Sequence, residues 1–220
     1  MTKEILLVRS NLRRSKGQAA AILILILLSS CMLNIWLMLA LDYKQNFDRC
    51  HDRLNAEHVA FTIDKEPDEI NNGLTQILEN DSRVTDYCMS RALSMTGSFE
   101  YNGGEMNTEF ILLNKHTALT RPIGKSEIVE EDSCKSGIYL PMLYKTGDIS
   151  IGKIIDISIG SHTMQYTVCG FFNNTMAGSH NCSMCILILT EDKYLELEDA
   201  GYAPKSSFVS IRIRHKEETE

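Results

Sequence analysis

Residues 18–41 read QAAAILILILLSSCMLNIWLMLAL, a run of 24 residues without a charged side chain. As a helix that rises about 1.5 Å per residue, this run is roughly 36 Å long, enough to cross a hydrocarbon core about 30 Å thick. A buried core helix of a soluble protein is the alternative, but the rest of the chain is largely polar and could hardly surround it. We therefore predict a transmembrane helix over 18–41.

Two processing signals compete with a retained membrane helix. A cleavable signal peptide has a shorter apolar region that ends at a small-residue site, and this run offers only Ala40 near its end. Residues 28–31, LSSC, resemble a lipobox that would lead to lipidation of Cys31. However, ten mostly apolar residues follow Cys31, where lipoproteins turn polar. We expect the helix to be retained.

The polar residues of the apolar run suggest a packing face. Ser30 and Asn34 are four residues apart, so they share one face of a helix and can hydrogen-bond to a neighbouring helix in the bilayer. The alternative is that the serines bond back to their own helix, which leaves only Asn34 to explain. We predict that Ser30 and Asn34 form a helix packing site.

The charges beside the apolar run predict its orientation. Residues 1–17 hold five basic side chains and one acidic side chain, which leaves a net charge of −11 for the rest of a chain whose total is −7. By the positive-inside rule, residues 1–17 lie in the cytoplasm as a basic amphipathic segment, and the acidic body lies outside the cell membrane. An acidic body also makes nucleic acid an unsuitable partner. The basic residues expected at the inner lipid interface are Arg9, Arg13, Arg14 and Lys16.

The body shows an α+β pattern. Residues 42–57 continue the helix as a stalk, and alternating apolar residues predict strands at 58–63, 84–101 and 106–114, the last two joined by a turn at Asn102-Gly103-Gly104. We predict an extracytoplasmic α/β subdomain over 58–120, an inserted β-rich subdomain over 121–206 and a returning strand over 207–220. The other elements expected are helices at 68–79 and 191–202 and strands at 136–141, 153–160, 164–172, 185–190 and 207–215.

No motif of catalytic or cofactor chemistry is present in the sequence. It contains no GxGxxG, GxxxxGK[ST], GxSxG or HExxH pattern, and its six His residues are scattered singly, as surface residues are. We therefore expect a non-catalytic protein with no cofactor, no metal and no catalytic residues.

The cysteines leave several possibilities open. Cys182 and Cys185 form the closest pair and are a possible disulfide or thiol pair. A metal or redox site with His180 is less well supported, because a zinc site needs further ligands, for which Cys169 is the nearest candidate. Outside the cell, free thiols or one to three disulfides are expected, and spacing does not give their connectivity.

One block of the body resembles a known family. Residues 138–172 read IYLPMLYKTGDISIGKIIDISIGSHTMQYTVCGFF, in which a strand, a proline, a Gly-Asp loop, an apolar strand and a Tyr-Thr-Val-x-Gly strand follow one another. With the basic start and the membrane helix, this order resembles the first half of an FtsX-like, MacB-type ABC transporter permease, including its MacB-like periplasmic core domain. The resemblance covers nearly the whole chain through loose, structural motifs.

The resemblance implies a transport role. Members of the family pair with a separate cytoplasmic P-loop ATPase, dimerise, and pass ATP-driven motion to the outer domain, which binds a substrate or a partner. They have four membrane helices, whereas this sequence has one. We therefore expect a fragment, a truncated product, or a half that needs a second permease copy or companion membrane chain. The alternative is a solitary, single-pass anchored binding or sensing protein.

Overall fold

The computed structural model describes residues 16–70, 72–176 and 184–214. The chain divides into two compact units, Met1–Arg49 and Cys50–Glu220. Residues 1–15 lie outside the described part, so the predictions for Arg9, Arg13 and Arg14 do too. Lys16 is exposed and begins the first described helix.

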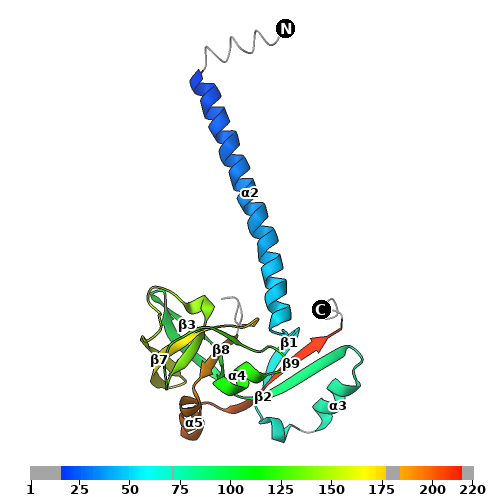
Figure 1. The fold of residues 1–220 in the computed structure, drawn as a ribbon. Helices are drawn as coiled ribbons and strands as arrows, with labels where there is room; N and C mark the ends of the chain where they lie inside the picture. Colours follow the sequence, from blue (N-terminus) through cyan, green and yellow to red (C-terminus); the bar gives the residue numbers. More distant parts are fainter. Residues whose placement is uncertain (1–15, 71, 177–183, 215–220) are drawn as a thin grey trace. The chain divides into compact units, whose positions relative to one another are not determined.

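A single continuous helix, α2 (Lys16–Arg53), contains the apolar run (Figure 1). No glycine or proline interrupts it after Gly17, so its backbone hydrogen bonds continue through the polar residues that follow the run. Within the described residues, α2 is the helix whose length and mean hydropathy of 2.5 suffice to cross a membrane. The helical continuation predicted beyond residue 41 is confirmed as far as Arg53, while the role of 42–57 as a stalk stays a prediction.

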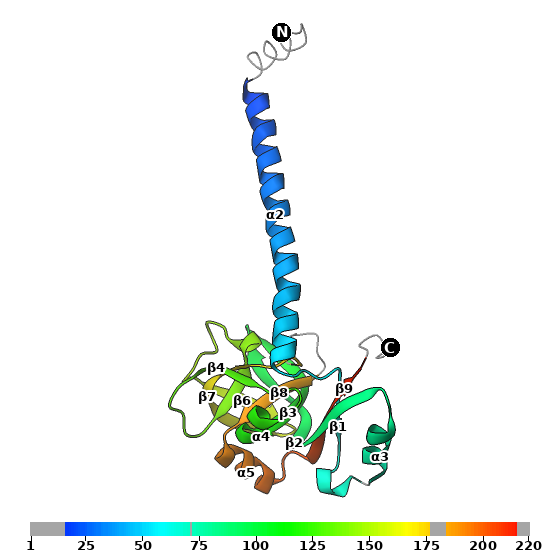
Figure 2. The same ribbon diagram turned by 45° about the vertical axis from the view of Figure 1, so that its right-hand side comes forward.

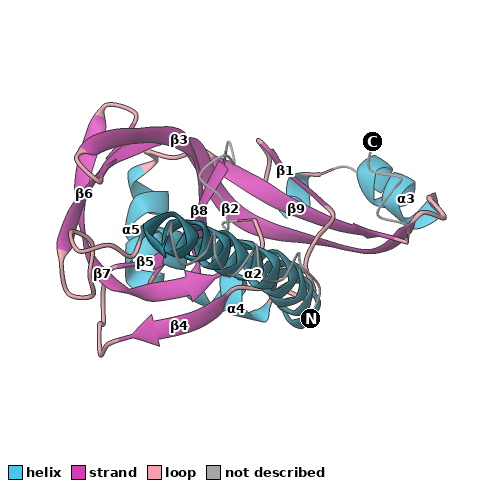
Figure 3. Cartoon of the chain, turned by 90° about the horizontal axis from the view of Figure 1, so that it is seen from above, coloured by secondary structure: helices cyan, strands magenta, loops and turns pink. Residues whose placement is uncertain are grey.

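In the described part of the second unit, one mixed sheet holds the strands together, in the order β1-β9-β2-β3-β8-β5-β7-β4, with β6 paired to β2 and β7 (Figure 3). The subdomain boundary predicted at residue 121 does not interrupt this sheet, because β3 from the first part pairs in parallel with β8 from the second. The strands are β1 (Val59–Ile63), β2 (Val84–Tyr101), β3 (Gly104–Asn114), β4 (Glu127–Glu131), β5 (Ile138–Pro141), β6 (Ile154–Ile159), β7 (His162–Asn173), β8 (Met184–Leu189) and β9 (Lys205–Ile213).

Strand β2 connects two regions of the sheet. Its first half pairs with β9 from Val84 to Leu93, and its second half forms a hairpin with β3. The turn uses Asn102 and Gly103, both with positive φ, as the Asn-Gly signal predicts. In β3, Phe110 and Leu112 enter one buried cluster while Ile111 enters another, so the central strands are covered on both faces.

The short helices differ in part from the prediction. The helix predicted over 68–79 is a 3₁₀ turn, η1 (Pro67–Glu69), followed by α3 (Asn72–Asn80). Helix α5 (Glu191–Ala200) confirms the second predicted helix and ends at Gly201, whose φ is 67°. Helix α4 (Lys115–Thr120), strand β4 and the 3₁₀ turn η2 (Met142–Tyr144) had no predicted counterpart. Figure 2 shows α4 and α5 beside the strands of the second unit.

Candidate functional site

The site lies within the second unit, where the chain leaves the last turn of α2 and enters the sheet. After Arg53 the chain leaves the helix through Asn55, whose φ of 49° is in the left-handed region. This conformation is costly for a residue with a side chain, although Asn tolerates it better than most residues do. The flanking Leu54 and Ala56 are fully buried, and the Ala56 N–H donates to the His51 carbonyl at 2.9 Å. Burial of both neighbours therefore fixes the backbone at Asn55.

The side chain and backbone of Asn55 join this segment to two distant parts of the chain. Its Nδ2 donates to the Pro122 carbonyl at 2.6 Å, and its own carbonyl accepts from the Gly124 N–H at 2.9 Å. The Arg212 guanidinium of β9 donates to Asn55 Oδ1. We call this set, Asn55, Pro122, Gly124 and Arg212, the Asn55 clamp.

The first and last strands of the domain lie side by side (Figures 1 and 3). Strand β1 pairs antiparallel with β9, with Val59 opposite Ile211. Just before β1, the His58 N–H donates to the Ile211 carbonyl at 2.9 Å, and His58 Nδ1 accepts from the Ile213 N–H at 3.0 Å. The segment that enters the domain is therefore held to the strand by which the described chain leaves it.

Two buried residues of opposite charge, Glu57 and Arg121, lie close in sequence to the clamp residues Asn55 and Pro122. Glu57 and Arg121 retain only 7% and 4% of their accessible surface. Glu57 Oε2 accepts a long hydrogen bond of 3.4 Å from Thr175, and Arg121 Nη2 donates to Ser210 of β9 at 2.6 Å. Burial of ionised groups is costly without full compensation, and both side chains keep atoms without a hydrogen-bond partner among the described residues.

The pKa values of these two groups move toward their neutral forms. Burial raises the pKa of the Glu57 carboxyl, and a backbone hydrogen bond, the Arg121 charge and Thr175 oppose that rise. Burial likewise lowers the pKa of Arg121, against the influence of Cys88 and Glu57. Gly124 makes this close packing possible, because a Cβ there would lie 2.0 Å from Glu57 Oε2.

An exposed ion pair adds little to this arrangement. Arg53 at the end of α2 lies 2.7 Å from Glu127 of β4, and both side chains are about half exposed. Such pairs contribute about 0–1 kcal/mol to stability. The Arg53–Glu127 pair therefore contributes little to holding the end of α2 in place.

Two of the histidines expected at the surface take part in this region. His51 is buried, and its ring stacks on His58 with centroids 5.5 Å apart. The expectation is thus wrong for His51, because the last turn of α2 packs against the residues that follow it, with Ala56 bonded to the His51 carbonyl and His58 stacked on its ring.

The predicted helix packing site shows a local hydrogen bond. Asn34 Nδ2 donates to the Ser30 carbonyl at 2.9 Å, within α2 itself. The alternative considered from the sequence was back-bonding by the serine side chains, whereas this hydrogen bond is donated by the Asn34 amide. Both side chains are exposed on α2, and their contact with another membrane helix stays a prediction.

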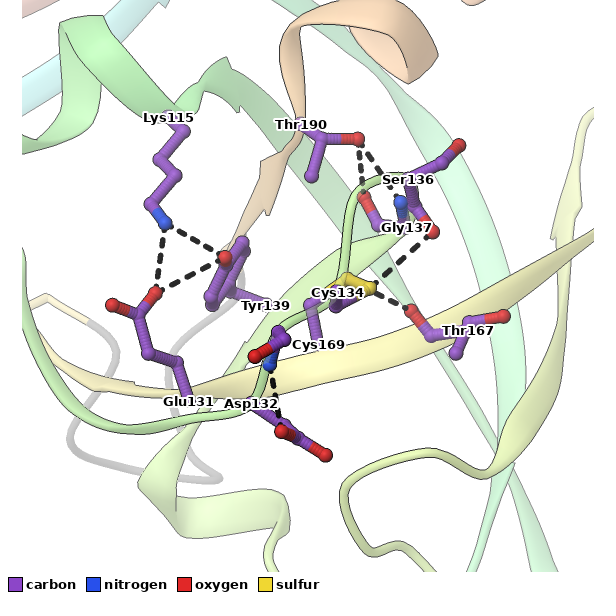
Figure 4. The surroundings of a disulfide bond; sticks show 11 residues. Lys115, Glu131, Asp132, Cys134, Ser136, Gly137, Tyr139, Thr167, Cys169 and Thr190 are labelled. Atoms are coloured by element: carbon purple, nitrogen blue, oxygen red, sulfur yellow. Dashed lines mark hydrogen bonds and ion pairs between the residues drawn. A yellow bond between two sulfur atoms is a disulfide. The ribbon is translucent and has the colours of Figure 1, made fainter.

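The structure pairs cysteines that the sequence did not pair. Figure 4 shows a disulfide between Cys134 and Cys169, which joins the loop before β5 to β7. Cys169 is therefore not available as the zinc ligand considered from the sequence. Cys182 lies outside the described residues, so its pairing with the buried Cys185 stays a prediction.

A polar group lies beside this disulfide. Lys115 Nζ donates to Glu131 at 2.8 Å and to the Tyr139 hydroxyl at 2.7 Å (Figure 4). These contacts give the Lys115 ammonium group two hydrogen-bond acceptors and attach α4 to β4 and β5. In the part of the chain that the structure describes, no cluster of three His, Cys, Asp or Glu side chains could hold a metal ion.

Comparison with known proteins gives structural similarities only. No family model matches the sequence, and no curated protein does. The extracellular domain of the noncanonic ABC-type transporter YknZ from Gram-positive bacteria is 12% identical over 70% of this chain and 78% of that chain, with a TM-score of 0.34. The periplasmic region of MacB from Actinobacillus actinomycetemcomitans is 10% identical over 62% of each chain, with a TM-score of 0.35.

The described part of the chain has an α+β fold in which α2 precedes a mixed sheet. Sequence reasoning did not find the Asn55 clamp, since its members are far apart in the chain. The available signal was an Asn directly after a helix of predominantly apolar and charged residues, which is compatible with a left-handed helix end.

Proposed function

We propose that the chain is a membrane-spanning permease component of an FtsX-like, MacB-type ABC transporter. In this proposal α2 crosses the cell membrane with the N-terminus in the cytoplasm, and the domain that follows lies outside and binds a substrate or partner. ATP is hydrolysed by a separate cytoplasmic P-loop ATPase. A second permease copy or a companion membrane chain packs against α2 through Ser30 and Asn34, and membrane lipid surrounds the basic residues at its start.

The observation that carries the proposal is the Asn55 clamp. A component that transmits motion needs a stiff connection between its membrane helix and its outer domain. The last turn of α2 continues into Asn55, which is hydrogen-bonded both to the 122–124 loop and to Arg212 of β9. A displacement of that turn therefore reaches the first and last strands of the sheet together. The order of elements that resembles the permease family supports the same role.

Affinity capture of the tagged full-length chain from native membranes in mild detergent tests the proposed partners. We expect a P-loop ATPase and a polytopic membrane chain to be recovered with it. As a matched control, Asn34→Leu should reduce recovery of the membrane chain, whereas Met32→Leu, on the opposite side of the helix, should not. Recovery of neither partner with a stable, inserted chain would refute the transporter proposal in favour of a solitary anchored receptor.

Nucleotide-dependent hydrogen exchange tests the transmission. With the captured ATPase present, ATP should change the exchange of amides at 55–58 and 121–126 relative to ADP. Asn55→Gly should diminish this difference while leaving ATP hydrolysis intact. An unchanged difference in Asn55→Gly would mean that motion passes by another route.

A further inference from the structure

Cys88 lies on β2, the strand that pairs with β9, near the buried Arg121. In the register of β2 and β9 it stands opposite Ser210. Its thiol is half-buried and free, and its Sγ is 3.5 Å from Ser90 Oγ. The position is thus reachable by a small solute and is bordered by polar groups.

Arg121 supplies a fixed positive charge to this position. Its guanidinium lies 4.3 Å from the Phe208 ring centroid and donates to Ser210 through Nη2, which fixes the orientation of the side chain. Because Ser210 stands opposite Cys88 in the β2–β9 register, this hydrogen bond places the guanidinium beside Cys88. Burial lowers the pKa of Arg121, and the influence of Cys88 is the largest of those that oppose this shift.

Two donors of that guanidinium are not satisfied. Arg121 Nε and Nη1 are buried and have no hydrogen-bond partner within the described residues. Leaving a buried donor unpaired is costly, and a thiol sulfur is only a weak acceptor. An oxygen atom carried on the Cys88 sulfur would be a strong acceptor at this place.

We propose that Cys88 is an oxidative modification site, at which a hydroperoxide converts the thiolate to a sulfenic acid that Arg121 holds. The Cys88 sulfur attacks one peroxide oxygen, the O–O bond breaks, and an S–O bond forms. The sulfur is oxidised by two electrons, and the other peroxide oxygen leaves as hydroxide or alkoxide, which takes a proton from solvent. The new oxygen accepts a hydrogen bond from one of the two unpaired donors of Arg121, and the guanidinium stabilises the negative charge that develops during attack.

The modification would strengthen a connection that already exists. Arg121 follows α4 and directly precedes Pro122 of the Asn55 clamp, whereas Cys88 belongs to β2. A sulfenic acid bonded to Arg121 would add a contact between β2 and the 121–124 loop. The inference concerns this chain's own residues and holds whether or not an ATPase binds, so its failure is distinguishable from failure of the proposed function.

Trapping of sulfenic acid in the full-length chain tests the inference. The protein in detergent is treated with a small excess of hydrogen peroxide in the presence of dimedone, and the labelled peptides are quantified by mass spectrometry over time. Cys50, which is also half-buried and free, is the internal reference. We expect labelling at Cys88 to be roughly tenfold faster than at Cys50, because a charge-assisted hydrogen bond favours the product only at Cys88. Equal or slower labelling at Cys88 in the wild-type chain overturns the proposal.

Two variants test whether Arg121 acts through its unpaired donors or only through packing. Arg121→Lys keeps a positive charge but removes the two unsatisfied donors together, so labelling at Cys88 should fall to the rate at Cys50. Ser210→Ala removes the partner of Nη2 and leaves Nε and Nη1, so it should retain fast labelling. Loss of labelling in both variants with an unchanged thermal transition would show that Arg121 acts only by packing. If Arg121→Lys does not fold, the wild-type ratio of Cys88 to Cys50 decides the question alone.

Discussion

Asn55 and Arg212 are 157 positions apart in the chain, and the Arg212 guanidinium donates a hydrogen bond to the Asn55 side-chain oxygen. The contact joins the turn that follows α2 to the last strand of the sheet. Because Asn55 also bonds to Pro122, one side chain links three segments. Its left-handed backbone presents both side-chain atoms to these partners at once.

Substitution of Asn55 should distinguish its side chain from its backbone conformation. Asn55→Gly keeps the positive φ without strain but removes the side-chain hydrogen bonds, so we expect the free energy of unfolding to fall by about 1–3 kcal/mol. Asn55→Ala should cost about 1–2 kcal/mol more, because alanine disfavours the left-handed region. Urea unfolding of the full-length chain in detergent measures both differences.

Asn102 provides the matched control for this series. It has a φ of 51° in the exposed β2–β3 turn. Asn102→Gly should therefore be neutral or slightly stabilising, since glycine adopts positive φ without cost. An Asn55→Gly variant as stable as the wild type would mean that the clamp contacts contribute nothing measurable.

Much of the fold follows from local patterns in the sequence. An extended segment was predicted over 84–101 within a strand, helix, strand unit, and β2 spans these residues. The uncharged run predicted a helix, and α2 contains it. Short elements without a full period, such as α4 with six residues, lacked this signal. The order of strands was also not predicted, because pairing of β3 with β8 depends on contacts distant in sequence.

The candidate site could not be predicted from the sequence, because its residues meet only in the folded chain. Glu57 and Arg121 each look like ordinary surface charges among polar neighbours, and only folding reveals that both are buried. The partner of Cys134 was equally hidden, because cysteine spacing does not specify connectivity. What the sequence showed was the class of the longer elements, and not which elements meet.

Glu57 should make stability depend on pH. Its pKa is raised by burial, so the folded state binds the proton more tightly than the unfolded state does. Stability from this group is therefore greatest below the ordinary glutamate pKa and is lost as the pH rises through the raised folded value. Glu57→Gln should abolish that loss and make the protein more stable than the wild type at neutral pH. Thermal unfolding measured across this pH range gives the comparison.

Glu127→Gln is the control for Glu57. Glu127 is exposed and pairs with Arg53, so its removal should leave the pH dependence of the wild type in place. If Glu57→Gln and the wild type show parallel curves of stability against pH, then Glu57 is ionised in the folded state without a cost in free energy. Its assignment as a buried carboxyl beside Arg121 would then be wrong.

The Cys134–Cys169 disulfide should stabilise the second unit. It closes a loop with a sequence separation of 35, for which the chain-entropy relation gives about 4 kcal/mol. The double variant Cys134→Ala, Cys169→Ala should therefore melt at a lower temperature than the wild type, and a reductant should lower the wild-type melting temperature but not that of the variant. Cys50→Ser should behave as the wild type does. A reductant effect that persists in the double variant would show that another disulfide is responsible.

Asn34 should contribute to association within the membrane. Its Nδ2 bonds to the Ser30 carbonyl, and one N–H and the Oδ1 atom remain for a neighbouring helix. An interhelical hydrogen bond in a bilayer contributes about 0.5–2 kcal/mol, so Asn34→Leu should weaken association roughly 2- to 30-fold. Energy transfer between labelled chains in vesicles measures self-association, and co-reconstitution with a captured membrane chain measures hetero-association. Met32→Leu, on the other side of the helix, should leave both unchanged. Equal association of both variants would place the packing face elsewhere on α2, since hydrophobic contact alone does not distinguish helix faces from lipid.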